Sequence, residues 1–364
     1  MANTRSRDEI GLINKFFKDY RLNASIAERS SHVAGKSYIV LTVILGAGAR
    51  ISAIEARLGE LAEMLSAYRG APTPVRLRRM PLALEIPHPA PEPPIPPALS
   101  PVRPHSMLCG QTYDFGGSVT DEVIDLSLTP HTLLAGTTGS GKSVLLTTML
   151  WSLVAATSPA DLRLILIDLK NEDLVPFADL PHIETFAASL RDAAGAIESL
   201  HAHKEHRVRT RQRGQRIVLV IDELAELARL NDTMRLLASV LAIGRSKSIN
   251  VIAATQKPLS AIVGSVAKAN FTTRLIGRVM SSDDARIAAG VSGIGAEYLP
   301  GRGAFLRVEG MDIRRFQSYW IQDIDMRLAA VTDRWTVQLP IQPAWIVAYE
   351  SQRVLHLSPE RTAP

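Results

Sequence analysis

The chain has 364 residues, of which 46% are hydrophobic and 21% charged, values typical of a globular protein with two or three domains. Its 41 basic and 36 acidic side chains give a net charge of +5, which fits a polyanionic partner or an ordinary solvated basic face. The single cysteine, Cys109, excludes a disulfide framework and a cysteine-based zinc site, and it favours a reducing, cytoplasmic location.

The first 86 residues predict a small α+β domain. Apolar residues recur at helical spacing from Ile10 to Tyr20 and again from Ile51 to Leu65, which predicts two helices. The β-branched run Tyr38–Leu45 predicts a strand between them, and Val75 to Leu84 predicts further extended chain. The apolar run around that strand is too short to span a bilayer, and the N-terminus lacks the apolar stretch of a signal peptide, so no transmembrane segment is expected.

A proline-rich linker is predicted at 87–106. Nine prolines lie between Pro87 and Pro104, and because proline fixes φ and lacks a backbone donor, this stretch cannot form a helix or a central strand. We expect a semi-rigid spacer; a docking motif for a partner is the alternative.

Residues 107–322 alternate short apolar runs with helical stretches. The predicted strands are 131–135, 164–167, 217–221 and 251–254, with 275–279 and 304–308 as further candidates, and the predicted helices are 143–156, 191–213 and 232–243. This alternation is typical of an α/β domain with a mostly parallel sheet covered on both faces. Residues 323–364 are assigned as a C-terminal tail.

The segment 136–143, GTTGSGKS, fits the pattern of a phosphate-binding loop, GxxxxGK[ST]. An apolar strand precedes it and an apolar helix follows, as such a loop requires. Its backbone amides and the helix N-terminus would hold the phosphates, Lys142 would bridge the β- and γ-phosphates, and Ser143 would ligate Mg²⁺. The cofactors predicted are therefore ATP and Mg²⁺. The predicted nucleotide-binding residues are Gly136, Thr137, Thr138, Gly139, Ser140, Gly141, Lys142, Ser143 and Val144.

Two carboxylates follow the apolar strand at 217–221. In a parallel sheet they would lie at the carboxyl edge, where ligands bind, so Asp222 is expected to hold Mg²⁺ through water and Glu223 to polarise the attacking water. A plain buried strand followed by an acidic helix cap is the alternative. Gln256, at the end of another strand, is a candidate sensor of the γ-phosphate, although Thr255 and Gln256 are also ordinary turn residues.

With these motifs the chain resembles the FtsK/SpoIIIE family of DNA translocases. The resemblance rests on AGTTGSGKSV, IDLKNEDLVPFADLPHI, GRSKSINVIAATQKP and GAEYLPGRGAFL, and more loosely on GARISAIEARLGELAEML near the N-terminus. It implies a RecA-like P-loop ATPase that forms a homohexamer with ATP between neighbours. Arg245 matches the arginine finger that would act on the adjacent subunit's γ-phosphate, and Lys257 and Lys268 match positions that contact double-stranded DNA in the pore.

The chain also departs from the family pattern. A pore lysine of the family falls at Ser282, followed by Asp283, which weakens the expected DNA contact or shifts it to Arg278 or Arg302. No counterpart of the family's membrane region or C-terminal winged-helix domain is recognised, so the resemblance covers the motor portion. A basic cluster at 204–216 is interpreted as a solvated face, with a nucleic-acid or acidic-partner contact as the alternative.

The predicted function is ATP-driven, sequence-independent translocation of double-stranded DNA by a homohexamer. The N-terminal domain would form a second ring and bind a cargo or a membrane-anchor partner. The alternatives are an ATPase of the same superfamily that moves secreted proteins, a plasmid- or phage-borne DNA transfer or packaging motor, and an interaction protein that uses ATP only to assemble.

Overall fold

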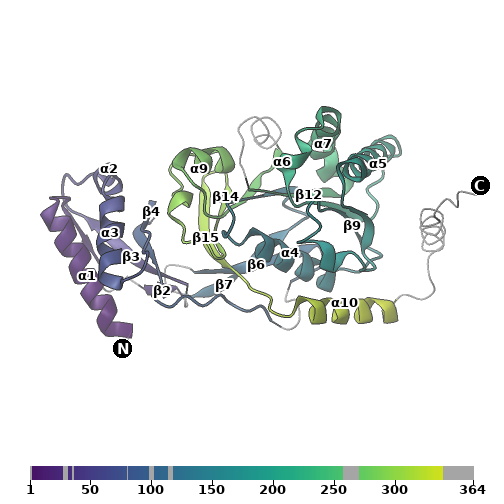
Figure 1. Cartoon of the computed structure of the whole chain (residues 1–364). Coiled ribbons are helices and arrows are strands. Elements are labelled where there is room, and N and C mark those ends of the chain that lie inside the picture. Colours follow the sequence, from purple (N-terminus) through teal and green to yellow (C-terminus); the bar gives the residue numbers. More distant parts are fainter. Residues whose placement is uncertain are drawn as a thin grey trace, which may run out of the picture.

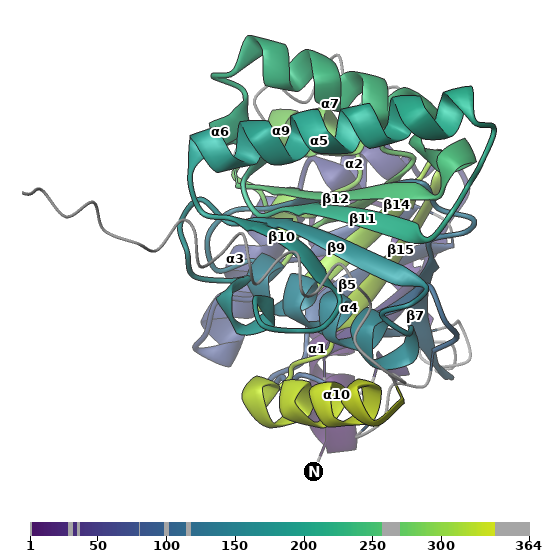
Figure 2. The ribbon, with the colours of Figure 1, turned by 90° about the vertical axis from the view of Figure 1, so that its right-hand side faces the viewer.

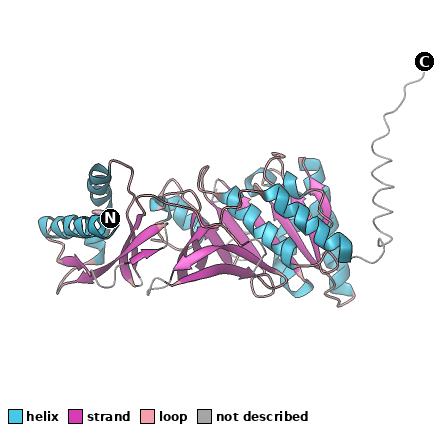
Figure 3. Ribbon diagram, turned by 90° about the horizontal axis from the view of Figure 1, so that it is seen from below, coloured by secondary structure: helices cyan, strands magenta, loops and turns pink. Residues whose placement is uncertain are grey.

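The computed structural model describes residues 2–27, 32–34, 37–79, 81–97, 102–113, 118–256 and 270–338. These residues form a small unit with a five-stranded sheet and a larger unit built on a ten-stranded sheet. The two units lie end to end, so the molecule is elongated (Figures 1 and 3). None of the helices in these ranges is long and apolar enough to cross a membrane.

The small unit packs helices on an antiparallel sheet of order β1-β3-β5-β4, with β2 beside β3. Its elements are α1 (Ala2–Asp19), β1 (Ala24–Ile26), β2 (His32–Ala34), β3 (Tyr38–Leu45), α2 (Ile51–Glu55), α3 (Leu58–Arg69), β4 (Arg76–Arg79) and β5 (Leu82–Pro87). The helical repeat from Ile10 to Phe17 is buried against α3 and the sheet, as its spacing predicts.

The single helix expected over 51–65 is wrong. The chain leaves helical geometry at Arg57 (φ −112°, ψ 6°), which separates α2 from α3. The Arg57 guanidinium lies 5.0 Å from the ring centroid of Tyr20 and donates to Glu60. Ile54 and Leu58 are both buried, so the apolar repeat continues across the break and hides it from a sequence pattern.

The large sheet has the order β10-β9-β11-β12-β8-β13-β14-β15-β6-β7. The pairs from β10 to β13 are parallel, and the pairs from β13 to β7 are antiparallel. Its strands are β6 (Ser106–Tyr113), β7 (Val119–Asp125), β8 (His131–Ala135), β9 (Leu162–Ile167), β10 (Ile183–Ala187), β11 (Arg216–Ile221), β12 (Ile249–Thr255), β13 (Thr273–Ile276), β14 (Ala304–Glu309) and β15 (Asp312–Ser318). The predicted α/β class is thus confirmed, with an antiparallel extension on one side.

Helices cover both faces of the parallel part (Figure 2). Three helices, α5 (Leu190–Arg209), α6 (Leu224–Leu227) and α7 (Asn231–Ile243), lie on one face, and α4 (Lys142–Ala156) and α10 (Ile324–Gln338) lie on the other. Successive residues of β9 alternate between the two cores, since Leu164 and Leu166 pack with α4 whereas Ile165 and Ile167 pack with α5. This two-sided burial explains the uninterrupted apolar runs of the central strands.

The region assigned as a tail contains α10, which covers the C-terminal end of α4. Trp335 Nε1 donates to Val154 O (2.8 Å), Arg334 Nη1 donates to Ala155 O (3.0 Å), and His182 Nε2 donates to Thr157 O (2.8 Å). These donors satisfy carbonyl groups that the end of a helix leaves unpaired, and Arg334 adds positive charge there.

A buried ion cluster joins the two units. Glu85 of β5 is almost fully buried and pairs with Arg76 (2.7 Å) of its own unit and with Arg315 (3.1 Å) of β15. The Arg315 guanidinium also lies 3.9 Å from the ring centroid of Tyr38. Arg76 Nε donates to Ile294 O (2.9 Å), so one guanidinium contacts both units.

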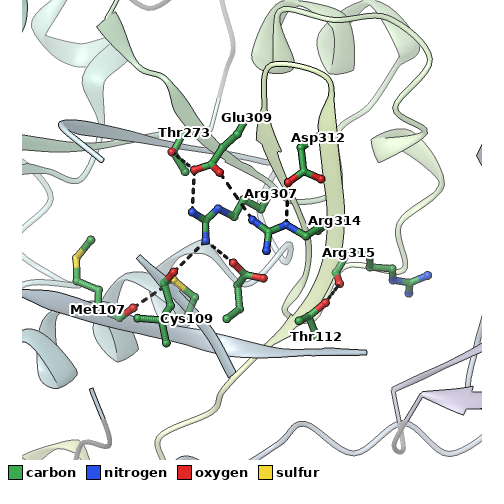
Figure 4. A network of polar contacts seen from close by, with 11 residues as sticks. Met107, Cys109, Thr112, Thr273, Arg307, Glu309, Asp312, Arg314 and Arg315 are labelled. Atoms are coloured by element: carbon green, nitrogen blue, oxygen red, sulfur yellow. Dashed lines mark hydrogen bonds and ion pairs between the residues drawn. The ribbon is translucent and has the colours of Figure 1, made fainter. Parts of the chain in front are cut away.

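A second ion network holds the antiparallel extension together (Figure 4). Arg307 of β14 pairs with Glu309 (2.8 Å) and with the buried Glu122 of β7. Glu309 also accepts a hydrogen bond from Thr273 of β13, so the network spans three strands.

Candidate active site

The phosphate-binding loop lies between β8 and α4, at the carboxyl edge of the parallel strands. Gly139 and Gly141 have φ of 77° and 99°, values that side chains disfavour. A Cβ on Gly141 would lie 2.6 Å from the backbone nitrogen of Gly303. Glycine is therefore required here both for the turn and for the close approach of a second segment, 301–303.

Lys142 is the first residue of α4, and its side chain lies among the acidic groups of the site. Burial lowers the pKa of its ammonium group, while the charges of Glu223 and Asp222 act in the opposite direction. A buried cation at the N-terminus of a helix favours a bound anion, because the helix dipole adds to its charge.

Three oxygen-bearing side chains converge beside Lys142. Ser143 Oγ donates a hydrogen bond to Asp173, whose charge acts on Asp222. Burial of Asp222, with the charges of Asp173 and Asp168, raises the pKa of its carboxyl to about 6. Within the described ranges no group of three His, Cys, Asp or Glu side chains forms a protein-only metal site. A hydroxyl and two crowded carboxylates fit Mg²⁺, which takes one or two carboxylates and completes its shell with water and phosphate oxygens.

Asp173 was not among the predicted site residues, and a buried carboxylate positions its loop. Asp168 follows β9 and accepts backbone hydrogen bonds from Asn171 (2.9 Å), Glu172 (3.0 Å) and Leu174 (2.9 Å), as well as from Lys170. The loop thereby turns back along the carboxyl edge of the sheet. The sequence does carry a signal for Asp173, because it is an acidic residue shortly after β9. This strand lies beside β11, which Asp222 follows.

Glu223 and Gln256 lie together at the ends of β11 and β12. The Gln256 backbone N–H lies 3.2 Å from both carboxylate oxygens of Glu223. The Gln256 side chain in turn accepts a hydrogen bond from Thr138 Oγ1 of the phosphate-binding loop (3.2 Å). The structure thus connects the candidate base, the candidate sensor and the loop through two contacts.

Arg245 lies at the amino ends of the parallel strands, whereas the phosphate-binding loop lies at their carboxyl ends. It belongs to the short helix η3 (Gly244–Lys247), which precedes β12, whereas the loop follows β8, and these two strands are parallel. The length of β12 therefore separates Arg245 from the loop of its own chain by roughly 20 Å. Its side chain is exposed and makes no ion pair with any residue that the structure describes.

The predicted DNA contacts Lys257 and Lys268 lie outside the described residues. Ser282 begins helix α9 (Ser282–Ala289), with Asp283 in the first turn. The alternative contacts Arg278 and Arg302 lie beside the phosphate-binding loop, since Thr137 N donates to Arg278 O (2.8 Å) and Arg302 N donates to Gly139 O (3.0 Å). Their backbones are thus part of the nucleotide side of the molecule.

The interpretation of 204–216 as a uniformly solvated face is wrong for three of its cations. Lys204 is buried and donates to Ser239 Oγ (2.6 Å). Arg207 donates to Lys247 O (2.6 Å) and Gln215 O (2.7 Å), and Arg216 donates to Asn250 Oδ1 (2.6 Å). Arg207 and Arg216 thus bond to partly buried polar groups near the amino ends of the strands, and Lys204 bonds to α7, contacts that charge patterning alone cannot reveal.

Comparison with known proteins supports the family resemblance. The model described as FtsK/SpoIIIE family matches residues 106–214. The chain is 32% identical over 255 residues to DNA translocase FtsK of Leptospira interrogans, covering 62% of this chain and 26% of that protein. It is 34% identical over 211 residues to DNA translocase SftA of Bacillus subtilis, covering 51% of this chain and 22% of that protein. The resemblance is confirmed, and the chain spans about a quarter of the length of these relatives.

Solved structures share the fold. The pCW3 conjugation coupling protein TcpA, in a monomer form with ATPgS, superposes with a TM-score of 0.55 at 19% identity, covering 89% of this chain and 99% of that chain. EssC (ATPases 2 and 3) from Geobacillus thermodenitrificans superposes with a TM-score of 0.59 at 16% identity, covering 68% of this chain and 53% of that chain. The large unit accordingly has the RecA-like P-loop ATPase fold.

Proposed function

We propose that this chain is the motor portion of an ATP-driven translocase of double-stranded DNA. One observation carries the proposal: the phosphate-binding loop, Asp222 and Glu223 meet at one edge of the sheet, and Arg245 lies at the other. The names of the similar proteins, DNA translocases FtsK and SftA, supply duplex DNA as the substrate to test.

In this proposal the loop residues 136–144 hold the triphosphate, with Lys142 between the β- and γ-phosphates. Ser143 would ligate Mg²⁺ and Asp222 would hold it through water, with Asp173 as a further carboxylate beside them. The bound ion would neutralise charge that develops on the phosphate oxygens. Glu223 accepts a proton from the attacking water, and its contact with the Gln256 N–H keeps its carboxylate oriented. Gln256, bonded to Thr138, would exchange this partner for the γ-phosphate when the loop is occupied.

Arg245 completes the site of a neighbouring subunit rather than its own. As a finger, Arg245 would need a second copy, because roughly 20 Å separates it from the loop of its own chain. The homohexamer implied by the family resemblance would supply that copy. A cation supplied by the neighbour stabilises the transition state and makes hydrolysis depend on assembly. The duplex would contact Lys257 and Lys268 through its phosphates, so binding is independent of sequence and weakens with salt. The small unit would connect the motor to a cargo or a membrane-anchor partner.

The proposal is tested by measuring ATP hydrolysis with and without duplex DNA. We expect duplex DNA to raise the rate of the wild type, and Lys142→Ala or Glu223→Gln to reduce it at least about 100-fold, the size of effect seen when a group stabilising the transition state is lost. Glu226→Gln is the matched control, because Glu226 is an exposed carboxylate three residues further along that pairs with Arg229.

Two results would contradict the proposal. A rate that duplex DNA leaves unchanged but an unfolded polypeptide raises would indicate a protein-moving ATPase. A Glu223→Gln variant that hydrolyses ATP as fast as Glu226→Gln would show that the mechanism is wrong.

A further inference from the structure

The short helix η3, which carries Arg245, is packed on one side and exposed on the other. Gly244 is buried, and a Cβ at this position would lie 2.8 Å from Ile249 O and 3.3 Å from His131 Cε1. Arg245 and Ser246 are exposed. The inner side of η3 therefore has no space for a side chain, whereas its outer side presents Arg245 away from the chain.

Arg207 of α5 holds the C-terminal end of η3. Its buried guanidinium donates to Lys247 O (2.6 Å) and to Gln215 O (2.7 Å). Gly214 has φ of 67°, and a Cβ on it would lie 3.2 Å from Arg207 Nη2, so the turn after α5 closes over the guanidinium. Hydrogen bonds from a charged donor are stronger than those from a neutral one, so this contact fixes the backbone two residues after Arg245.

The N-terminal end of η3 is fixed by α7, which leads directly into it. Lys204 lies one turn before Arg207 on α5 and donates to Ser239 Oγ of α7 (2.6 Å), so neighbouring cations of one helix contact α7 and η3. Ser246 Oγ donates back to Ile243 O, the last residue of α7 (3.0 Å). Both ends of η3 are thus bonded to helices of the same chain.

His131, the first residue of β8, supports the same region from the sheet. Its buried Nδ1 accepts a hydrogen bond from Val251 N (3.0 Å), so Nε2 carries the ring proton and donates to Leu241 O (2.9 Å). These two contacts use the neutral ring, and burial lowers the pKa of the imidazole to about 4. Strand β8 ends at Ala135, where the phosphate-binding loop begins, so one strand supports η3 at one end and the loop at the other.

We propose that Arg207 and His131 are positioning residues for Arg245, holding η3 where the finger reaches the nucleotide of a neighbouring chain. The inference rests on the proposed function, since it needs Arg245 to act on a second copy. Both side chains are buried and bonded to backbone groups of their own chain, so they act through η3 and not on the nucleotide. Precise placement matters, because a shift of about 1 Å in a group that acts on the transition state can cost about 100-fold in rate.

ATP hydrolysis by the full chain with duplex DNA tests the role of Arg207. We expect Arg207→Met to lower kcat about 10- to 100-fold and to change the KM for ATP by less than about twofold, because the loop of the same chain lies at the other ends of the strands. Arg209→Met is the matched control, since Arg209 is exposed two residues further along α5, and it should hydrolyse ATP as the wild type does.

Mixed assemblies separate positioning of the finger from a general defect of the fold. Glu223→Gln chains cannot hydrolyse ATP in the proposed mechanism, but their Arg245 is intact. Arg207→Met chains should therefore regain activity when mixed with them, because the intact loop of an Arg207→Met chain then meets a correctly held Arg245. A chain whose own fold is damaged would gain nothing from such a neighbour. His131→Phe, which keeps a ring but loses both hydrogen bonds, should behave in the same way.

Arg245→Ala calibrates the experiment, because it removes the finger itself and should also regain activity beside Glu223→Gln chains. If Arg245→Ala gains nothing on mixing, the proposed function in which Arg245 serves a neighbour is wrong. Arg207→Lys, whose single ammonium should reach only one of the two carbonyls, should give an intermediate kcat and the same recovery, so it carries the test if Arg207→Met does not fold. Wild-type kcat in Arg207→Met, or recovery in Arg245→Ala but in neither Arg207 variant, would overturn the positioning role alone.

Discussion

The surroundings of the Asp222 carboxyl favour a bound cation, because they crowd negative charge in a buried place. Its environment combines burial with the charges of Asp173 and Asp168, and Lys170 and Lys142 offset these only in part, so its pKa rises to about 6. A cation that replaces the proton relieves this crowding. Loss of a proton is therefore part of metal binding at this position.

We predict that binding of Mg²⁺ with ATP releases more protons from the wild type than from Asp222→Asn at pH 6. A group whose pKa is about 6 is half protonated at that pH, so the difference should be about half a proton, and it should vanish at pH 8. Calorimetry in buffers of different ionisation enthalpy measures it. Asp232→Asn, at an exposed carboxylate, should behave as the wild type. Equal proton release from Asp222→Asn and the wild type would assign the shift to another group.

At the scale of the elements, α10 packs against α4 and bonds to its C-terminal end. The phosphate-binding loop begins α4, and α10 covers the other end of the same helix through Trp335 and Arg334. The Arg327 guanidinium of α10 lies 4.6 Å from the ring centroid of Trp151 in α4. It also donates a hydrogen bond to Pro97 O in the proline-rich linker. Helix α10 thereby contacts both the C-terminal end of α4 and the proline-rich linker.

We predict that Trp335→Ala destabilises the fold by about 3–5 kcal/mol, because it removes a buried indole and its hydrogen bond to Val154 O. Met326→Ala on the same helix should change the free energy of unfolding by less than about 0.5 kcal/mol, since that side chain is exposed. Chemical denaturation followed by circular dichroism gives both values. Similar stability of the two variants would mean that α10 does not contribute to the core.

The sequence predicts the central parallel strands and β14, but it does not predict β6, β7 and β15, for a physical reason. β8 and β11 are buried on both faces, so they read as continuous apolar runs. β7 and β15 contain neighbouring charged residues, some of them paired within the sheet, as Glu122 is with Arg307, and their sequences look like surface chain. Helix α10 was missed for a related reason, because its apolar side chains are spread among polar ones.

Some features of the candidate site can likewise be predicted from the sequence and others cannot. The loop at 136–143 and the pair Asp222–Glu223 follow local patterns, so their positions can be read from the sequence. Contacts between distant backbones have no such signature. Two examples are the hydrogen bond from Gly303 N to Ser140 O and the one from Trp320 N to Pro94 O of the proline-rich linker. Both depend on the order of strands in the sheet, which a single sequence does not reveal.

At the scale of the whole molecule, Glu85 connects the two units through charge. Burial alone would raise the pKa of its carboxyl, but Arg76, Arg315 and Arg78 together lower it to about 2. A carboxyl whose pKa is lowered in the folded state stabilises the fold above its ordinary pKa, and this stabilisation is lost as the pH falls toward the lowered value. The relevant window is therefore about pH 4.5 to 2.

We predict that the free energy of unfolding falls by about 3 kcal/mol more in the wild type than in Glu85→Gln between pH 5 and pH 2. At pH 7, Glu85→Gln should already be less stable by about 3–5 kcal/mol, because its arginine partners lose their counter-charge in a buried place. Urea unfolding across this range measures both effects. Glu63→Gln, at an exposed carboxylate of α3, should reproduce the wild-type dependence, and the same dependence in Glu85→Gln would contradict the assignment.

In the proposed mechanism, the position of Arg245 at the amino ends of the strands, opposite the phosphate-binding loop, bears on how the subunits can be arranged. In a two-fold dimer the contacts are reciprocal, so Arg245 of each chain would reach the loop of the other only if both lay in one shared interface. In a head-to-tail arrangement the loop and Arg245 would instead lie in two different interfaces of the same chain. Such an arrangement either closes into a ring or continues as a filament, and only closure gives every subunit both neighbours. In a ring closed in this way, each chain would supply Arg245 to the same one of its two neighbours, so all the sites would point the same way around the axis.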